Sequence, residues 1–372
     1  MFFVSFASLW SFSYFLYITY SMLVLSVIMY LVPAVKTNVS YSFSKKKIIS
    51  DVVTGFDIFP VLALPFVTVL LLNLIWSSPE FSAWFGHIIF TSFQYKITYL
   101  VTLFFLVVSF IFLSVSYFSS REIYDYLITT FGFWYWILLL FFSNSIFTAI
   151  FIIEVLSALI FLLLTTSTFS TTFFYRNLNF SFGGFFQNST PSTHLTSIIF
   201  FFWTSLLASL SLFIFLILFF MKISTFDYYL MEHIFLYLVQ ISHYRDMSAL
   251  VIVWFVLMFS IFLKCGIAPL FLWKPTFFKG LPIYTIFFYI TFFYFFIFLF
   301  FITLLSSYFG DILGLFSIVS MLFVLSGLLT LLFIMCEAYY LKSFMAISSI
   351  LNSLLVLLAL SASHTTDIAL WL

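Results

Sequence analysis

The chain has 372 residues, of which 65% are hydrophobic and only 7% are charged, and its net charge is +1. An ordinary soluble domain carries roughly a quarter charged residues, so the composition excludes that class. High hydrophobicity also excludes a disordered chain, and a total of two cysteines excludes a disulfide-rich scaffold. The near-zero net charge gives no basis for binding nucleic acid. A polytopic membrane protein remains.

Phenylalanine contributes 61 residues, whereas Gly and Pro contribute 10 and 8. Codons rich in A and T favour this bias, so an AT-rich organellar genome is one hypothesis. The other is that apolar side chains are nearly interchangeable wherever they face lipid. The N-terminus predicts no cleavable targeting segment, because the first basic residue is Lys36.

Ten apolar stretches are long enough to cross the hydrocarbon core, which takes about 20 residues in a helix. They lie near residues 10–32, 57–76, 96–117, 124–143, 145–166, 196–221, 248–272, 283–308, 311–335 and 343–363. Long unbroken apolar runs favour helices over a β-barrel, whose strands alternate polar and apolar residues. The sequence therefore predicts an all-α polytopic membrane protein.

The distribution of basic residues predicts the orientation, because cytoplasmic-type loops carry an excess of Lys and Arg. Odd-numbered loops hold Lys36, Lys45, Lys46, Lys47, Arg121, Arg176, Lys274, Lys279 and Lys342. Even-numbered loops hold Lys96, Lys222 and Arg245. We therefore expect the odd loops on the inner side and both termini on the outer side. Lys342 is expected to be solvated, in the turn before the last stretch.

Two ionisable residues lie well inside apolar stretches: Glu154 near the middle of 145–166, and Lys264 within 248–272. A charge at the bilayer centre costs about 2.5–3.5 kcal/mol on insertion scales, so such groups usually face a bundle interior or a wet cavity. One interpretation is a proton or ion relay. The other is a buried ion pair that only fixes helix packing.

Pro269 and Gly266 follow Lys264 closely and predict a broken helix beside it. Proline removes a backbone hydrogen bond and clashes with the preceding turn, and glycine loosens the same region. Broken backbone at membrane depth is tolerated where it lines a cavity. An ordinary proline kink is the alternative.

Motifs for cofactors are missing from the sequence. There is no Walker loop, no dinucleotide fingerprint and no cysteine cluster, and no predicted helix carries the two histidines of a haem bundle. Cys265 and Cys336 are interpreted as small apolar residues rather than ligands.

Four segments, in order, resemble the antiporter-like proton-pumping subunits of respiratory complex I. Residues 121–124 (REIY) resemble the start of the fourth helix of that family, and residues 153–160 (IEVLSALI) resemble its fifth-helix motif. Residues 264–275 (KCGIAPLFLWKP) and 280–282 (GLP) follow the family pattern through a broken seventh helix. Residues 341–350 (LKSFMAISSI) resemble its tenth helix.

Within this family, the mitochondrially encoded type of subunit 2 of NADH:ubiquinone oxidoreductase is most similar, because no His follows residues 282–286. The resemblance implies a multi-pass subunit of the mitochondrial inner membrane that contributes to proton translocation coupled to NADH oxidation by ubiquinone. Its termini would face the intermembrane space. Glu154 and Lys264 would form the proton relay, and Gly266 and Pro269 would break the helix.

By the same resemblance, this chain would bind no cofactor, and NAD, FMN, iron–sulfur clusters and ubiquinone would belong to other subunits. Expected partners are other membrane-arm subunits, lipids such as cardiolipin, and a separate chain supplying missing C-terminal helices; no nucleic acid is expected. The implied domains are three N-terminal transmembrane helices in 1–120, a five-helix proton-channel repeat in 121–308, and the start of a second repeat in 309–372.

The sequence departs from the family pattern at two lysines. The sixth helix usually begins with a Lys, where this chain has Ile199 or Phe200, and the eighth usually holds another, where the nearest counterpart is Tyr294. Three functions therefore stay open: an active proton-translocating subunit, a structural subunit with a lost or reduced proton path, and a component of a cation/proton antiporter.

Overall fold

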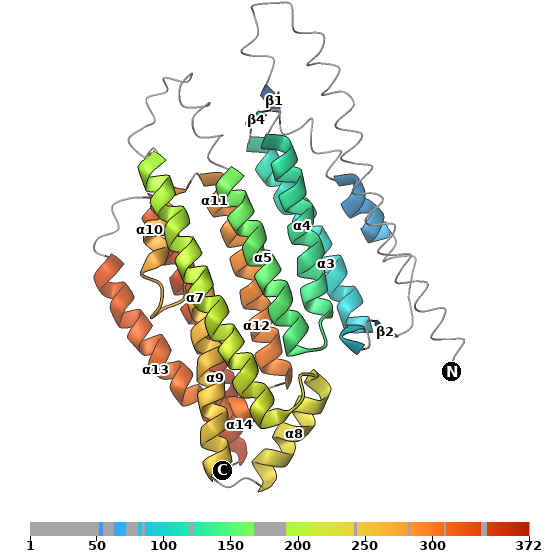
Figure 1. Ribbon diagram of the computed structural model, residues 1–372, viewed down its shortest axis with the longest axis vertical. Helices are drawn as coiled ribbons and strands as arrows, with labels where there is room; N and C mark the ends of the chain where they lie inside the picture. Colours follow the sequence, from blue (N-terminus) through green and yellow to red (C-terminus); the bar gives the residue numbers. More distant parts are fainter. Residues whose placement is uncertain are drawn as a thin grey trace, which may run out of the picture. The chain divides into compact units, whose positions relative to one another are not determined.

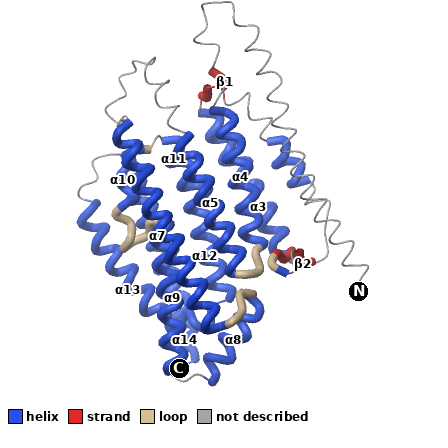
Figure 2. Tube along the Cα trace, viewed as in Figure 1, coloured by secondary structure: helices blue, strands red, loops and turns tan. Residues whose placement is uncertain are grey.

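The computed structural model describes the chain in segments that carry most of its helices (Figure 1). These are residues 52–54, 63–71, 81–83, 86–115, 117–119, 122–166, 191–241, 244–281, 283–308, 310–335 and 341–371. The chain forms two compact units, Met1–Asn144 and Ser145–Leu372. Helices dominate both, and the described strands are short (Figure 2).

The first unit contains two long apolar helices that pack on each other, α3 (Ser92–Val115) and α4 (Glu122–Phe142). Its strands form two antiparallel pairs: β1 (Val52–Thr54) with β4 (Tyr117–Ser119), and β2 (Phe81–Ala83) with β3 (Ile88–Phe90).

A helical stretch at residues 63–71 contributes Phe66 to the core of this unit. Its ring lies 6.2 Å from that of Phe105 and 5.3 Å from that of Trp134. These aromatic residues are almost completely buried, so aromatic packing forms the centre of the unit.

The second unit is a bundle of helices (Figure 1). In chain order they are α5 (Ile146–Thr166), α7 (Pro191–Ile223), α8 (Tyr228–Ile241), α9 (Tyr244–Cys265), α10 (Trp273–Gly280), α11 (Ile283–Phe288), the π-helix η3 (Tyr289–Tyr294), α12 (Phe295–Tyr308), α13 (Gly310–Met335) and α14 (Leu341–Trp371). Helix α7 lies between α5 and α9 and also contacts α10, while α14 packs on α10 and α13. Helix α10 therefore lies inside the unit rather than outside it.

In the described part of the chain, five helices are long and apolar enough to cross a membrane. The spans are Phe93–Ile111, Ile146–Thr165, His194–Ile223, Thr285–Leu304 and Leu341–Ala359, and shorter apolar helices accompany them. Many large apolar side chains on these helices are exposed, as a lipid solvent requires. The prediction of an all-α polytopic membrane protein is confirmed.

The elements differ from the sequence prediction in a few places. Helix α8 was not predicted, because its 14 residues are too few to span the hydrocarbon core. Helix α7 begins at Pro191, a residue suited to the first helical position. The predicted stretch 10–32 lies outside the described residues, and of 57–76 only residues 63–71 are described.

The predicted break in the seventh apolar stretch is present. Helix α9 ends at Cys265, and Gly266 takes a left-handed conformation with φ +63° that favours glycine. The Ile267 N–H donates to the Phe262 carbonyl over 2.9 Å and closes the last turn. Pro269 has no N–H to extend the helix, so regular structure resumes only at α10. The break thus begins at Gly266, ahead of the proline.

A close approach between helices fixes α13 against this break. A Cβ added at Gly327 of α13 would lie 2.6 Å from the Cβ of Ala268, nearer than real Cβ atoms approach. Only glycine therefore allows α13 and the broken segment to touch at this point.

We predict that Gly327→Ala lowers stability by about 1–3 kcal/mol, the usual cost of overpacking. The measurement is the thermal unfolding of the detergent-solubilised assembly. Ser326→Ala is the matched control, since that side chain is exposed on the same helix. Adding Ala268→Gly to Gly327→Ala removes the clashing methyl group and should recover most of the loss; no recovery would contradict the packing argument.

Candidate functional site

The second unit holds a partly buried ion pair between Glu154 of α5 and Lys264 of α9. Lys264 Nζ lies 2.5 Å from Glu154 Oε1, so the two groups form a charge-assisted hydrogen bond. The Lys264 side chain is only 2% exposed, whereas that of Glu154 is 33% exposed. The lysine is thus enclosed, and the carboxylate is at the edge of the enclosure.

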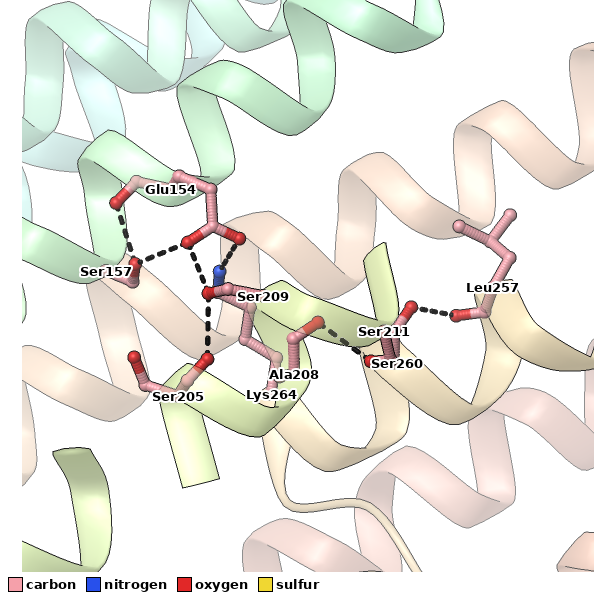
Figure 3. A network of polar contacts seen from close by, with 9 residues as sticks. All are labelled: Glu154, Ser157, Ser205, Ala208, Ser209, Ser211, Leu257, Ser260 and Lys264. Atoms are coloured by element: carbon pink, nitrogen blue, oxygen red, sulfur yellow. Dashed lines mark hydrogen bonds and ion pairs between the residues drawn. The ribbon is translucent and has the colours of Figure 1, made fainter. Parts of the chain in front are cut away.

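Serine hydroxyls complete the polar surroundings of Glu154 (Figure 3). The Ser209 hydroxyl lies 2.7 Å from Glu154 Oε2 and 2.8 Å from the Ser205 carbonyl oxygen. The Ser157 hydroxyl donates to the Glu154 carbonyl over 2.7 Å and lies 3.4 Å from Oε2. A carboxylate is the stronger acceptor, so Ser209 links α7 to the ion pair.

Helical spacing explains why these residues meet. Residues three or four apart lie on the same face of a helix. Glu154 and Ser157 are three apart on α5, and Ser205 and Ser209 are four apart on α7. Because α7 packs against both α5 and α9, its Ser209 hydroxyl reaches the Glu154 carboxylate, which in turn binds the Lys264 ammonium group of α9.

A second buried lysine lies in the same region. Lys274 of α10 is fully buried, and its Nζ lies 3.7 Å from the centre of the Tyr294 ring. Among the described residues, this Nζ has no hydrogen-bond partner. The Tyr294 hydroxyl in turn donates to the Ser349 carbonyl of α14 over 3.0 Å. The polar surroundings therefore extend from α10 through η3 to α14.

Two expectations for basic residues were wrong. Lys274 was assigned to an odd-numbered loop, but it lies in α10, which buries it. Lys342 was expected to be solvated, but it is 4% exposed and donates to the Leu281 carbonyl over 2.7 Å. Neither residue can count as a loop charge, and the orientation of the chain stays a prediction.

His194 is a further buried polar residue. It lies in the first turns of α7, and its Nδ1 is 3.1 Å from the carbonyl oxygen of Gly280. That carbonyl group closes α10, where unpaired carbonyl oxygens attract donors. His194 and Lys342 thus tie the C-terminal end of α10 to α7 and α14.

The remaining sequence candidates do not join the site. Ile199 and Phe200, at the position of the expected sixth-helix lysine, are apolar and are 45% and 47% exposed. Cys265 is buried beside Lys264, and Cys336 lies outside the described residues. No cluster of three or more potential metal ligands occurs within the segments that the structure describes.

The sequence did not point to Lys274, Tyr294 or Ser209 as site residues. The available signal for Lys274 was a lysine ten positions after Lys264, across a predicted break. Tyr294 was noted only as the residue in place of an eighth-helix lysine, and serine is common throughout the chain.

The fold resembles that of one chain in a known structure of a respiratory membrane complex. No protein-family model and no curated protein matches this chain. One similar solved structure is a chain of the membrane-bound sulfane sulfur reductase (MBS), an archaeal respiratory membrane complex, with a TM-score of 0.56 and 16% identity. The match covers 92% of this chain and 64% of that chain, so this chain spans less than two thirds of the other's length.

Fold and site together define a class. The protein is a polytopic α-helical membrane protein that shares its fold with a chain of a respiratory membrane complex. It carries a partly buried Glu–Lys pair at a broken helix. The chemistry open to such a pair is the exchange of a proton when the two groups separate or meet.

We predict that Ser209→Ala destabilises the assembly by about 1.5–3 kcal/mol, the usual value of a hydrogen bond to a charged group. Thermal unfolding of the solubilised assembly measures the change. Ser211→Ala is the matched control, because the Ser211 hydroxyl donates only to its own helix, at the Ala208 carbonyl. Equal effects of the two substitutions would contradict a role for Ser209 in holding the carboxylate.

Proposed function

We propose that this protein is a proton-translocating membrane subunit of a respiratory complex, with Glu154 and Lys264 as relay groups. The observation that carries the proposal is the ion pair itself, in which the enclosed Lys264 next to irregular backbone contacts the partly exposed Glu154. Replacing a buried pair with apolar residues is often neutral or stabilising. A pair at this position is therefore better explained by transport than by stability.

The mechanism follows from the cost of an isolated buried charge. While Glu154 and Lys264 are in contact, each stabilises the charged form of the other. Separation leaves both charges uncompensated, so Lys264 gives up a proton to the next acceptor and Glu154 takes one up. Irregular backbone at residues 266–272 sits beside Lys264, where a helix end can shift without breaking a regular hydrogen-bond ladder.

The finer assignment is to complex I, as a counterpart of its subunit 2 in the mitochondrial inner membrane. NADH oxidation by ubiquinone elsewhere in the complex would then drive the relay. The four sequence segments support this assignment, and so does a fold found in a respiratory membrane complex. We keep the division into residues 1–120, 121–308 and 309–372 as part of the proposal.

Neighbouring subunits are part of the proposal because the described residues of the second unit do not fully enclose Glu154. A third of its side chain is exposed, although α5 is an apolar membrane span. Acyl chains against a carboxylate would be costly. A polar surface of another membrane subunit, or water held at the contact, supplies the cover that the charge requires.

A structural subunit with a reduced path is the second candidate. It is favoured by the exposed Ile199 and Phe200 on α7 and by Tyr294 on η3, where relay lysines would otherwise be expected. In that case, the ion pair would only join α5 to α9.

We predict that Glu154→Gln or Lys264→Ala lowers proton transfer through this subunit by about a hundredfold, the lower end of what a positioned proton-transfer group contributes. The measurement is proton translocation per electron transferred in sealed membrane vesicles containing the assembled complex. Lys222→Ala is the control, because that lysine is exposed at the end of α7. Assembly with undiminished translocation in both variants would establish the structural role instead.

A further inference from the structure

Lys274 is a buried amine that the Glu154–Lys264 pair does not use. Its side chain is fully enclosed, and among the described residues no carboxylate forms an ion pair with it. A permanently charged ammonium group in such a place would carry a large desolvation cost. A neutral amine would not, and it would be ready to accept a proton.

The surroundings of Lys274 stabilise its protonated form only weakly. The face of the Tyr294 ring lies 3.7 Å from Nζ, and a cation–π contact stabilises an ammonium group by about 0.5–2 kcal/mol. That gain is much smaller than a carboxylate would supply at the same distance. Tyr294 is held in turn through its hydroxyl by the Ser349 carbonyl.

The broken helix brings Lys274 back against Gly266, two residues after Lys264. Cβ and Cδ of Lys274 would lie 3.3 Å and 3.0 Å from a Cβ added at Gly266. The aliphatic part of Lys274 therefore passes over Gly266, two residues after Lys264.

The helix that faces Lys274 is also irregular. Tyr289 and Tyr294 begin and end the π-helix η3, and π-helical turns are frequent at functional sites. The Tyr289 hydroxyl is buried without a hydrogen-bond partner among the described residues, and its ring centre lies 6.5 Å from that of Tyr294. Two phenols and an amine thus share one enclosed region of an otherwise apolar bundle.

We propose that Lys274 is the group that receives the proton from Lys264. This inference rests on the proposed function and adds a residue to its path. An N–H bond breaks at the Lys264 ammonium group and another forms at the neutral Lys274 amine, so one proton and one positive charge move together. Lys264 is left neutral until it is protonated again, and Lys274 passes its proton on toward α14, where the Tyr294 hydroxyl is bonded.

The test compares Lys274→Met with Lys274→Arg in the assembled complex, with proton translocation per electron as the readout. A relay group must gain and lose a proton, so both variants should lose about as much translocation as Lys264→Ala. A cation needed only to pack on Tyr294 would predict that Arg preserves translocation, because Arg keeps the charge and packs well on aromatic rings. Preserved translocation in the Arg variant would overturn the inference.

If complexes with the single substitutions fail to assemble, a double substitution provides the test. The exchange Lys274→Tyr with Tyr294→Lys keeps one amine and one phenol in the same region and should restore at least a third of the lost translocation. Restored assembly without restored translocation would also overturn the inference. Failure of the proposed function is distinguishable, because then Lys264→Ala itself leaves translocation unchanged.

Discussion

Lys264 carries a positive charge into an apolar bundle, and the carboxylate of Glu154 balances it over 2.5 Å. This constraint organises the second unit. Helix α7 supplies Ser209 to the carboxylate and lies against both α5 and α9, so the helices that carry the charges are held by a shared neighbour. A buried charge that loses its partner is costly, and that cost is what makes the pair able to respond to a shift of either helix.

The break after Lys264 determines what else reaches this region. In an unbroken helix, ten residues rise about 15 Å, so Lys274 would lie nearly three turns away from Lys264. The left-handed conformation of Gly266 and the irregular residues up to 272 turn the chain back. Lys274 then packs over Gly266 and under Tyr294. One interruption of the helix thus allows the amines of Lys264 and Lys274 to be buried inside the same helical unit.

The sequence predicted much of the fold, because long apolar runs and a proline beside a buried lysine are local signals. Glu154 and Lys264 were singled out because a charge is rare in an apolar stretch. Lys274 was misassigned for the opposite reason: it lies just beyond a predicted span, where a lysine is normally solvated. Its burial depends on α10 packing against α7 and α14, a tertiary arrangement that spacing along the chain does not reveal.

The same physical argument weighs a relay against a purely structural subunit. Apolar side chains fill most of this chain, and Phe alone occupies 61 positions. An apolar residue at position 274 would avoid the desolvation cost that a buried lysine carries without a carboxylate. Packing gives no reason to place an amine there, since the aliphatic part of the Lys274 side chain is enough to fill the space over Gly266. An amine that can take up and release a proton gives such a reason, and the relay interpretation therefore accounts for Lys264 and Lys274 with one chemistry.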